Sequence, residues 1–149
     1  MSTAIHRRVE RLRAGDEPTL IARLPAGWAV FGEQQFVAGY SLLLPDPVVP
    51  DLHALTSHAQ QAFLADMARL GAAVQAATDA LRINYAIFGN QEPALHAHVI
   101  PRFADEAEEL RTTHPWAYDW SRAPALDPMR LVSLRGRIIA ALATSDAAG

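Results

Sequence analysis

Residues 83–103 read INYAIFGNQEPALHAHVIPRF, and this stretch predicts a β-hairpin. Residues 83–88 are rich in β-branched and aromatic side chains, which favour a strand. Residues 89–93, Gly-Asn-Gln-Glu-Pro, are typical of a turn. Residues 94–100 then form the second strand of the hairpin.

The second strand of this hairpin carries two histidines, His96 and His98. Side chains alternate between the two faces of a strand, so both imidazoles share one face with Ala94 and Ile100. Two residues along a strand span about 7 Å, which places two ionisable rings side by side. Titratable clusters of this kind mark functional sites more often than they serve packing.

The rest of the chain predicts helices at both ends and strands before one long helix. Strands are expected over residues 19–25, 28–33 and 35–45. A short helix is expected over residues 3–13, closed by Gly15. A final helix is expected from Asp127-Pro128 onward, with the apolar residues Leu131, Leu134, Ile138 and Leu142. The long helix starts at Thr56 or Ser57, and its expected core stripe consists of Phe63, Met67, Leu70, Val74, Ala77 and Leu81.

These elements predict a single α+β domain over residues 1–149, in which an antiparallel sheet is packed by the long helix on one face. Residues 1–18 form its N-terminal helix, residues 19–103 its core and residues 104–149 a C-terminal extension. The longest apolar runs are far shorter than the roughly 20 residues of a membrane span, and the N-terminus lacks a signal-peptide core. We expect a cytoplasmic protein that does not enter the membrane.

Composition excludes several classes of site. The chain has no cysteine, so it has no disulfide framework, thiolate nucleophile or zinc finger. All 13 basic residues are arginine, which excludes a P-loop lysine. A net charge of −3 argues against nucleic-acid binding. We expect no cofactor and no resident metal.

Three other segments carry unusual composition. The arginines of the first helix, at positions 7, 8, 11 and 13, are expected mainly on its solvent side. The acidic run over residues 104–109 is expected to face water. Residues 114–120, His-Pro-Trp-Ala-Tyr-Asp-Trp, predict either a packing arm, which can cross a subunit interface, or a wall on which Trp116 stacks a base.

Three functions compete for the two histidines. They are structural residues, metal ligands or parts of a nucleophilic site. A metal site needs a nearby acid, and the next one, Asp105, lies seven residues beyond His98 with Pro101 between them. A nucleophilic site needs one neutral imidazole and polar donors for developing charge. His96 can attack phosphorus while His98, with Asn90 or Gln91, donates hydrogen bonds to phosphate oxygens.

The segment His-Ala-His-Val-Ile-Pro-Arg over residues 96–102 resembles the end of the histidine triad (HIT) signature, His-φ-His-φ-His-φ-φ followed by Pro-Arg. Residues 39–45, GYSLLLP, followed by VVPDL over residues 48–52, are similar to the Gly-His-hydrophobic-Pro segment that leads into the family's helix. The resemblance covers about residues 25–103. It implies the α+β fold of that family.

The resemblance also implies a function. Family members are nucleotide hydrolases or nucleotidyl transferases whose middle histidine forms a covalent nucleotidyl intermediate, and His96 falls on that position. His98 falls on the third histidine, which contacts phosphate. The matched segments add Tyr40 and Arg102 to the expected substrate-binding residues. Substrates of the dinucleoside polyphosphate (such as diadenosine polyphosphate) or nucleoside phosphoramidate class, a metal-free chemical step and a homodimer are implied as well.

The chain departs from the signature at two positions. Ala94 replaces the first histidine, and Tyr40 replaces the upstream family histidine. The group that orients His96 must then come from Asn90, Gln91 or a backbone carbonyl. Two alternatives stay open: a non-catalytic nucleotide-binding or sensing protein of the same fold, and a His/carboxylate metalloenzyme.

Overall fold

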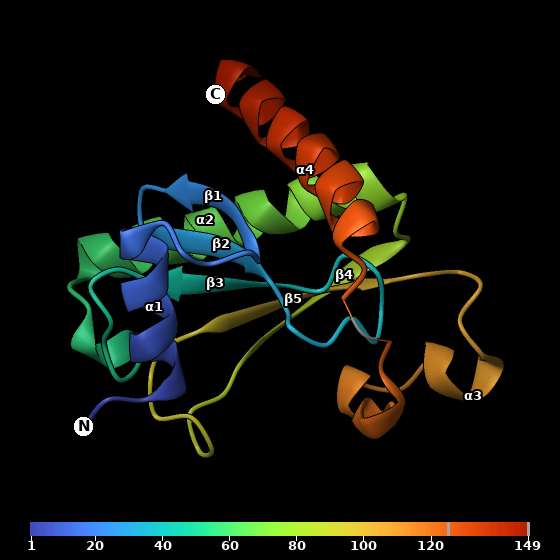
Figure 1. Cartoon of the computed structure of the whole chain (residues 1–149), viewed down its shortest axis with the longest axis horizontal. Helices are drawn as coiled ribbons and strands as arrows, with labels where there is room; N and C mark the ends of the chain where they lie inside the picture. Colours follow the sequence, from blue (N-terminus) through green and yellow to red (C-terminus); the bar gives the residue numbers. More distant parts are fainter. Residues whose placement is uncertain (125, 149) are drawn as a thin grey trace.

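The computed structural model describes residues 1–124 and 126–148. Within these residues, five strands form one antiparallel sheet in the order β1-β2-β3-β5-β4 (Figure 1). The strands are β1 (Leu20–Leu24), β2 (Gly27–Phe31), β3 (Ser41–Pro45), β4 (Arg82–Ile87) and β5 (Ala97–Arg102). The predicted hairpin is therefore the β4–β5 pair at one edge of the sheet.

Helices cover both faces of this sheet. The longer helices are α1 (Ala4–Ala14), α2 (Ser57–Thr78) and α4 (Pro128–Ala148), with a short α3 (Glu108–Arg111) after β5. Three 3₁₀ turns, Leu52–Ala54, Pro115–Ala117 and Trp120–Arg122, lie in the connections. The α+β class, with helical ends and one long helix on the sheet, is confirmed.

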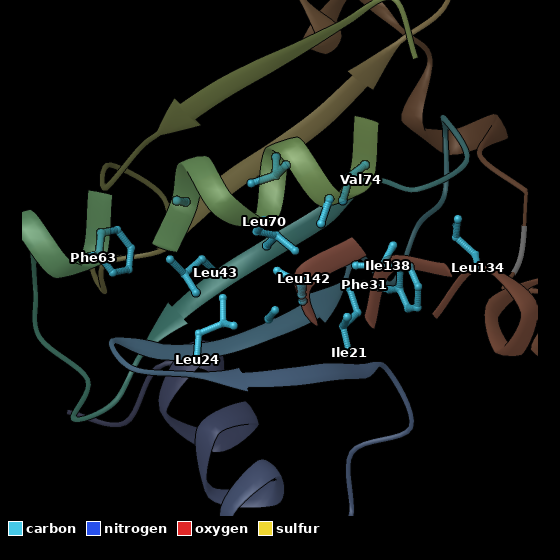
Figure 2. Packing of buried hydrophobic residues seen from close by; sticks show 14 of the residues in the cluster. Ile21, Leu24, Phe31, Leu43, Phe63, Leu70, Val74, Leu134, Ile138 and Leu142 are labelled. Atoms are coloured by element: carbon cyan, nitrogen blue, oxygen red, sulfur yellow. The ribbon is translucent and has the colours of Figure 1, made fainter. Parts of the chain in front are cut away.

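The main core lies between the sheet and α2, and α4 packs on α2. Figure 2 shows Phe63, Leu70 and Val74 of α2 in one cluster with Leu43 and Phe31 of the sheet. The apolar α4 residues Leu131, Leu134, Ile138 and Leu142 belong to the same cluster. Figure 2 shows the last three of them beside Phe31 and Ile21. The opposite face of the sheet packs against α1. This second cluster includes Tyr40 and Ala94.

The first helix ends as its sequence predicts. Thr3 caps its N-terminus by accepting a hydrogen bond from the His6 backbone N–H, and Gly15 closes it in the left-handed region at φ 75°. Arg7, Arg11 and Arg13 are exposed, in agreement with the prediction that the arginines lie mainly on the solvent side, whereas Arg8 is buried. The Arg8 guanidinium donates to Thr19 Oγ1 and to the Phe31 carbonyl, each at 2.6 Å, and so ties α1 to the sheet.

The strand expected over residues 35–45 forms only at Ser41–Pro45. The Gln35 side chain accepts from the Gly39 N–H and donates to the carbonyls of Gly32 and Tyr40, which closes residues 32–40 into a loop. Gly39 has φ 98°, a conformation that other residues rarely adopt. A side-chain amide thus supplies the bonds that a strand partner would otherwise make.

The long helix ends earlier than expected. Asp79 follows it in the left-handed conformation, so Leu81 is not part of the core stripe. Leu81 is 66% exposed, and its N–H donates to the Arg102 carbonyl next to the β4–β5 pair. None of the described helices is long and apolar enough to cross a membrane.

The α4 packing gives a matched pair of variants. Ile138 is fully buried whereas its neighbour Ile139 is 43% exposed. We expect Ile138→Ala to lower the free energy of unfolding by about 2–4 kcal/mol, because it leaves a cavity in the main core. Ile139→Ala should change it by less than about 0.5 kcal/mol. Urea unfolding followed by circular dichroism measures both, and equal losses would contradict the packing of α4.

Candidate functional site

The two histidines lie at the start of β5. This strand begins at Ala97, three residues later than the sequence predicts. The chain just before it is fixed by other bonds: the Leu95 N–H donates to the Val49 carbonyl, and the Ala94 N–H donates to the Glu92 carbonyl, each at 2.8 Å. His96 therefore stands on a backbone held from two sides.

His96 is oriented by a backbone carbonyl. Its Nδ1 lies 2.7 Å from the Ala94 carbonyl oxygen. A carbonyl only accepts hydrogen bonds, so Nδ1 carries the proton and Nε2 of the neutral ring keeps its lone pair. Nε2 has no hydrogen-bond partner within residues 1–124 and 126–148. This is the state that a nucleophilic imidazole requires.

His98 is held by the residue that replaces the upstream family histidine. The Tyr40 hydroxyl lies 2.6 Å from His98 Nδ1, and the two rings are stacked at 5.9 Å between centroids. A phenol O–H is more acidic than a neutral imidazole N–H, so Tyr40 is the better donor. Nδ1 then accepts, and His98 Nε2 carries the proton and serves as a donor.

The electrostatic surroundings keep the His98 imidazole and the Tyr40 hydroxyl neutral. Burial, and then the neighbouring His96, lower the pKa of His98 to about 4. Burial raises the pKa of the Tyr40 hydroxyl well above its ordinary value. The His96 and His98 ring centroids are 4.9 Å apart, which places His96 close enough to disfavour a charge on His98. The pair thus combines an unprotonated Nε2 on His96 with an uncharged N–H donor on His98.

A cavity of about 300 Å³ opens onto both imidazoles. Its lining consists of Phe88, Asn90, Gln91, Glu92, His96, His98 and Trp116. Five of the predicted site residues therefore meet in one place. Tyr40 lies behind this lining and acts on it through His98.

Arg102 lies elsewhere. It is buried, and all five of its N–H groups bond within the chain. Their acceptors are the Glu106 carboxylate, Asn84 Oδ1 and the carbonyls of Leu110 and Thr113, at 2.8–3.2 Å. Substrate binding by Arg102 stays a prediction, and this placement favours a structural role. Glu106, expected to face water, is its buried partner, with a side chain only 6% exposed.

Arg102 fixes the segment that carries the tryptophans. Trp116 packs edge-on against His98, with ring centroids 5.1 Å apart, and against Phe88 at 4.8 Å. Trp120 contacts Phe36 and Tyr40 at 4.0 and 5.7 Å. The segment is therefore a packing arm on its own chain, and Trp116 is also part of the cavity wall.

Sequence reasoning missed two lining residues, Phe88 and Glu92. Phe88 follows the last residue of β4, and its ring lies 6.0 Å from that of His98. Glu92 belongs to the loop that was expected to contribute Asn90 and Gln91. Its position next to Gln91 was the available signal, because the two residues are neighbours in the connection between β4 and β5.

Ala94 does not line the cavity. Its side chain is fully buried in the cluster that α1 forms with the sheet, together with Ile5 and Val9. Within the described residues, no three His, Asp or Glu side chains come together to hold a metal ion. The geometry therefore presents nucleophilic and hydrogen-bonding groups in one cavity.

A second cavity, of about 570 Å³, adjoins the first and shares Phe88 and Trp116 with it. Asn84 and His114 are among its other lining residues. Trp116 therefore lies between the chamber at the histidines and a larger one beside β4.

Solved structures with the same fold come from distant organisms. A histidine triad protein from Sinorhizobium meliloti is 21% identical, with a TM-score of 0.70 over 81% of this chain and 87% of its own. A hypothetical histidine triad nucleotide-binding protein from Sulfolobus tokodaii is 11% identical, with a TM-score of 0.73 over 93% and 92%. A zinc-bound histidine triad family protein from Mycobacterium smegmatis is 23% identical, with a TM-score of 0.67 over 93% and 94%.

No curated protein matches the chain. The family model of the HIT domain matches residues 19–105, which include all five strands, α2 and both site histidines. The chain therefore belongs to the histidine triad (HIT) family of nucleotide-binding proteins, hydrolases and transferases.

Proposed function

We propose that this protein transfers or hydrolyses a nucleotidyl group through a covalent intermediate on His96. The hydrogen bond from His96 Nδ1 to the Ala94 carbonyl is the observation that carries the proposal, because it leaves Nε2 unprotonated in the cavity. In the first step Nε2 attacks the phosphorus, an N–P bond forms, and the bond from phosphorus to the leaving group breaks.

His98 supports this step as a neutral donor. Its Nε2–H can donate to a non-bridging phosphoryl oxygen whose charge grows in the transition state. Asn90 and Gln91 line the same cavity and add amide N–H donors. The ring of His98 needs no reorganisation, because Tyr40 already holds it.

The charge of the cavity favours one substrate class. Among the described residues that line it, none is arginine or lysine, and Glu92 is the one carboxylate. A substrate with three or four phosphates would place several negative charges beside neutral donors. The loss of hydration of these charges would cost much free energy. Nucleoside phosphoramidates, with a single phosphoryl group, fit this lining better than dinucleoside polyphosphates.

The adjoining cavity suits the nucleoside part of such a substrate. Trp116 and Phe88 offer aromatic surface between the two chambers, and base–aromatic stacking contributes about 1–3 kcal/mol. A nucleotide with its phosphoryl group at the histidines can then place its base beside β4.

One observation favours a second candidate, a non-catalytic nucleotide-binding protein. Ala94 contributes no side chain to the cavity, so the reaction lacks the group that the first triad histidine would supply. The same cavity would then recognise a nucleotide without cleaving it. The homodimer and the cytoplasmic location also stay predictions.

Covalent trapping separates the two candidates. We expect wild type, incubated with adenosine 5′-phosphoramidate or diadenosine tetraphosphate and quenched in denaturant, to gain the mass of one adenylyl group. His96→Ala should gain none, because it removes the attacking nitrogen. His98→Asn should keep the adduct but form it more slowly. Intact-protein mass spectrometry reads all three, and product release without an adduct in wild type would contradict the mechanism.

Trp116 has a separate expected role in affinity. We expect Trp116→Ala to weaken AMP binding about 5- to 100-fold, since it removes the stacking surface. Isothermal titration measures this. Trp28→Ala is the control, because Trp28 does not line either chamber. Unchanged AMP affinity in Trp116→Ala would remove the assignment.

The lowered pKa of His98 predicts a pH dependence of stability. Below about pH 6.5 the unfolded chain protonates this imidazole, whereas the folded protein does so only near pH 4. The unfolded state therefore binds more protons in this window, and His98 lowers the free energy of unfolding as pH falls. The difference between wild type and His98→Asn should shift by about 3 kcal/mol against wild type from pH 7 to pH 4. Urea unfolding across this range tests it, and a constant difference would show that His98 titrates normally.

A further inference from the structure

The proposed function needs a proton acceptor in its second step. When water attacks the nucleotidyl-His96 phosphorus, the new O–P bond leaves a proton that must move to a base. The electron pair of the breaking N–P bond returns to His96 Nε2. A reaction at neutral pH is faster when a side chain in the cavity removes the proton from water.

Most groups that line the cavity cannot take this proton. Asn90 and Gln91 carry amides, which do not accept protons near neutral pH. His96 is bonded to phosphorus at this stage. His98 accepts the Tyr40 hydrogen bond at Nδ1, so its Nε2 already carries a proton and faces the reaction as a donor.

Glu92 is the remaining basic group in the described lining. Its Oε1 accepts a hydrogen bond of 3.4 Å from the Ile5 N–H in the first turn of α1. Its Oε2 accepts no hydrogen bond from residues 1–124 and 126–148. One carboxylate oxygen is therefore anchored while the other is available to a ligand.

The Glu92 carboxylate lies at the N-terminal end of α1. The N-terminus of a helix carries a partial positive charge, and the first turn of α1 has no acidic residue of its own. Glu92 supplies a negative charge there from a distant part of the sequence. Its side chain is only partly buried, so water can reach it from the cavity.

We propose that Glu92 is the general base that resolves the nucleotidyl-His96 intermediate. This inference rests on the proposed function and assigns a second catalytic residue to it. The water oxygen bonds to phosphorus, its proton moves to the Glu92 carboxylate, and the N–P electron pair returns to His96 Nε2. The protonated Glu92 then gives its proton to solvent.

The test is single-turnover and steady-state kinetics of Glu92→Gln with adenosine 5′-phosphoramidate. Glutamine keeps the size and the hydrogen bond to Ile5 but cannot accept a proton. We expect a burst of about one adenylyl group per chain at nearly the wild-type rate. Steady-state hydrolysis should then be about 10²- to 10⁴-fold slower, and the adduct should accumulate in mass spectra.

Azide gives an independent readout. It attacks phosphorus without losing a proton, so it should discharge the adduct of Glu92→Gln and of wild type at similar rates. Glu92→Asp keeps a carboxylate and should recover part of the hydrolysis. Thr3→Ala is the structural control, because it removes the α1 cap without touching the cavity and should leave the discharge rate unchanged.

The outcomes separate this inference from the function on which it rests. An adduct in wild type together with wild-type turnover by Glu92→Gln overturns the role of Glu92 alone. A variant that slows adduct formation and discharge equally, or that azide does not rescue, also overturns it. No adduct in wild type overturns the proposed function first.

Discussion

The site depends on one hydrogen bond, from His96 Nδ1 to the Ala94 carbonyl. Any residue can provide a carbonyl, so the bond requires a backbone path at position 94 and no particular side chain. That path is held by the Leu95 and Ala94 N–H groups, which donate to the carbonyls of Val49 and Glu92. Replacing the first histidine of the signature by alanine therefore removes a side chain but leaves the orientation of His96 intact.

The second replacement, of the upstream family histidine by Tyr40, also leaves a hydrogen bond at the site in place. Tyr40 keeps a ring hydrogen-bonded to His98, but a buried phenol that stays protonated acts as the donor of that bond. This fixes one tautomer of His98, with its proton on Nε2. Burial also opposes a positive charge on the His98 ring. His98 therefore stays a neutral hydrogen-bond donor over a wide pH range. In the mechanism proposed above, the two departures thus change the groups that move protons more than the group that attacks phosphorus.

The sequence predicts the features that depend on neighbours along the chain. Periodic apolar residues predicted α2, α4 and the hairpin, and one predicted loop-and-strand stretch brought Asn90, Gln91, His96 and His98 to one cavity. The errors involve long-range partners. Arg8 is buried because Thr19 and Phe31 offer acceptors, and Glu106 is buried because Arg102 pairs with it. Local composition makes such residues look solvent-exposed, since it contains no information on what lies opposite them.

Arg102 positions part of the cavity wall, a role that its place in the signature does not indicate. By binding Glu106 and the carbonyls of Leu110 and Thr113, it holds the segment that brings Trp116 against His98. All five N–H groups of its guanidinium are therefore occupied within the chain, and Arg102 does not line the cavity although it follows the histidines by only a few residues. Because the Arg102 guanidinium is engaged in holding the segment that forms this cavity wall, it cannot also neutralise phosphates inside the cavity. The cavity has to rely on neutral donors and on a single carboxylate, and this limits how much negative charge a ligand can bring.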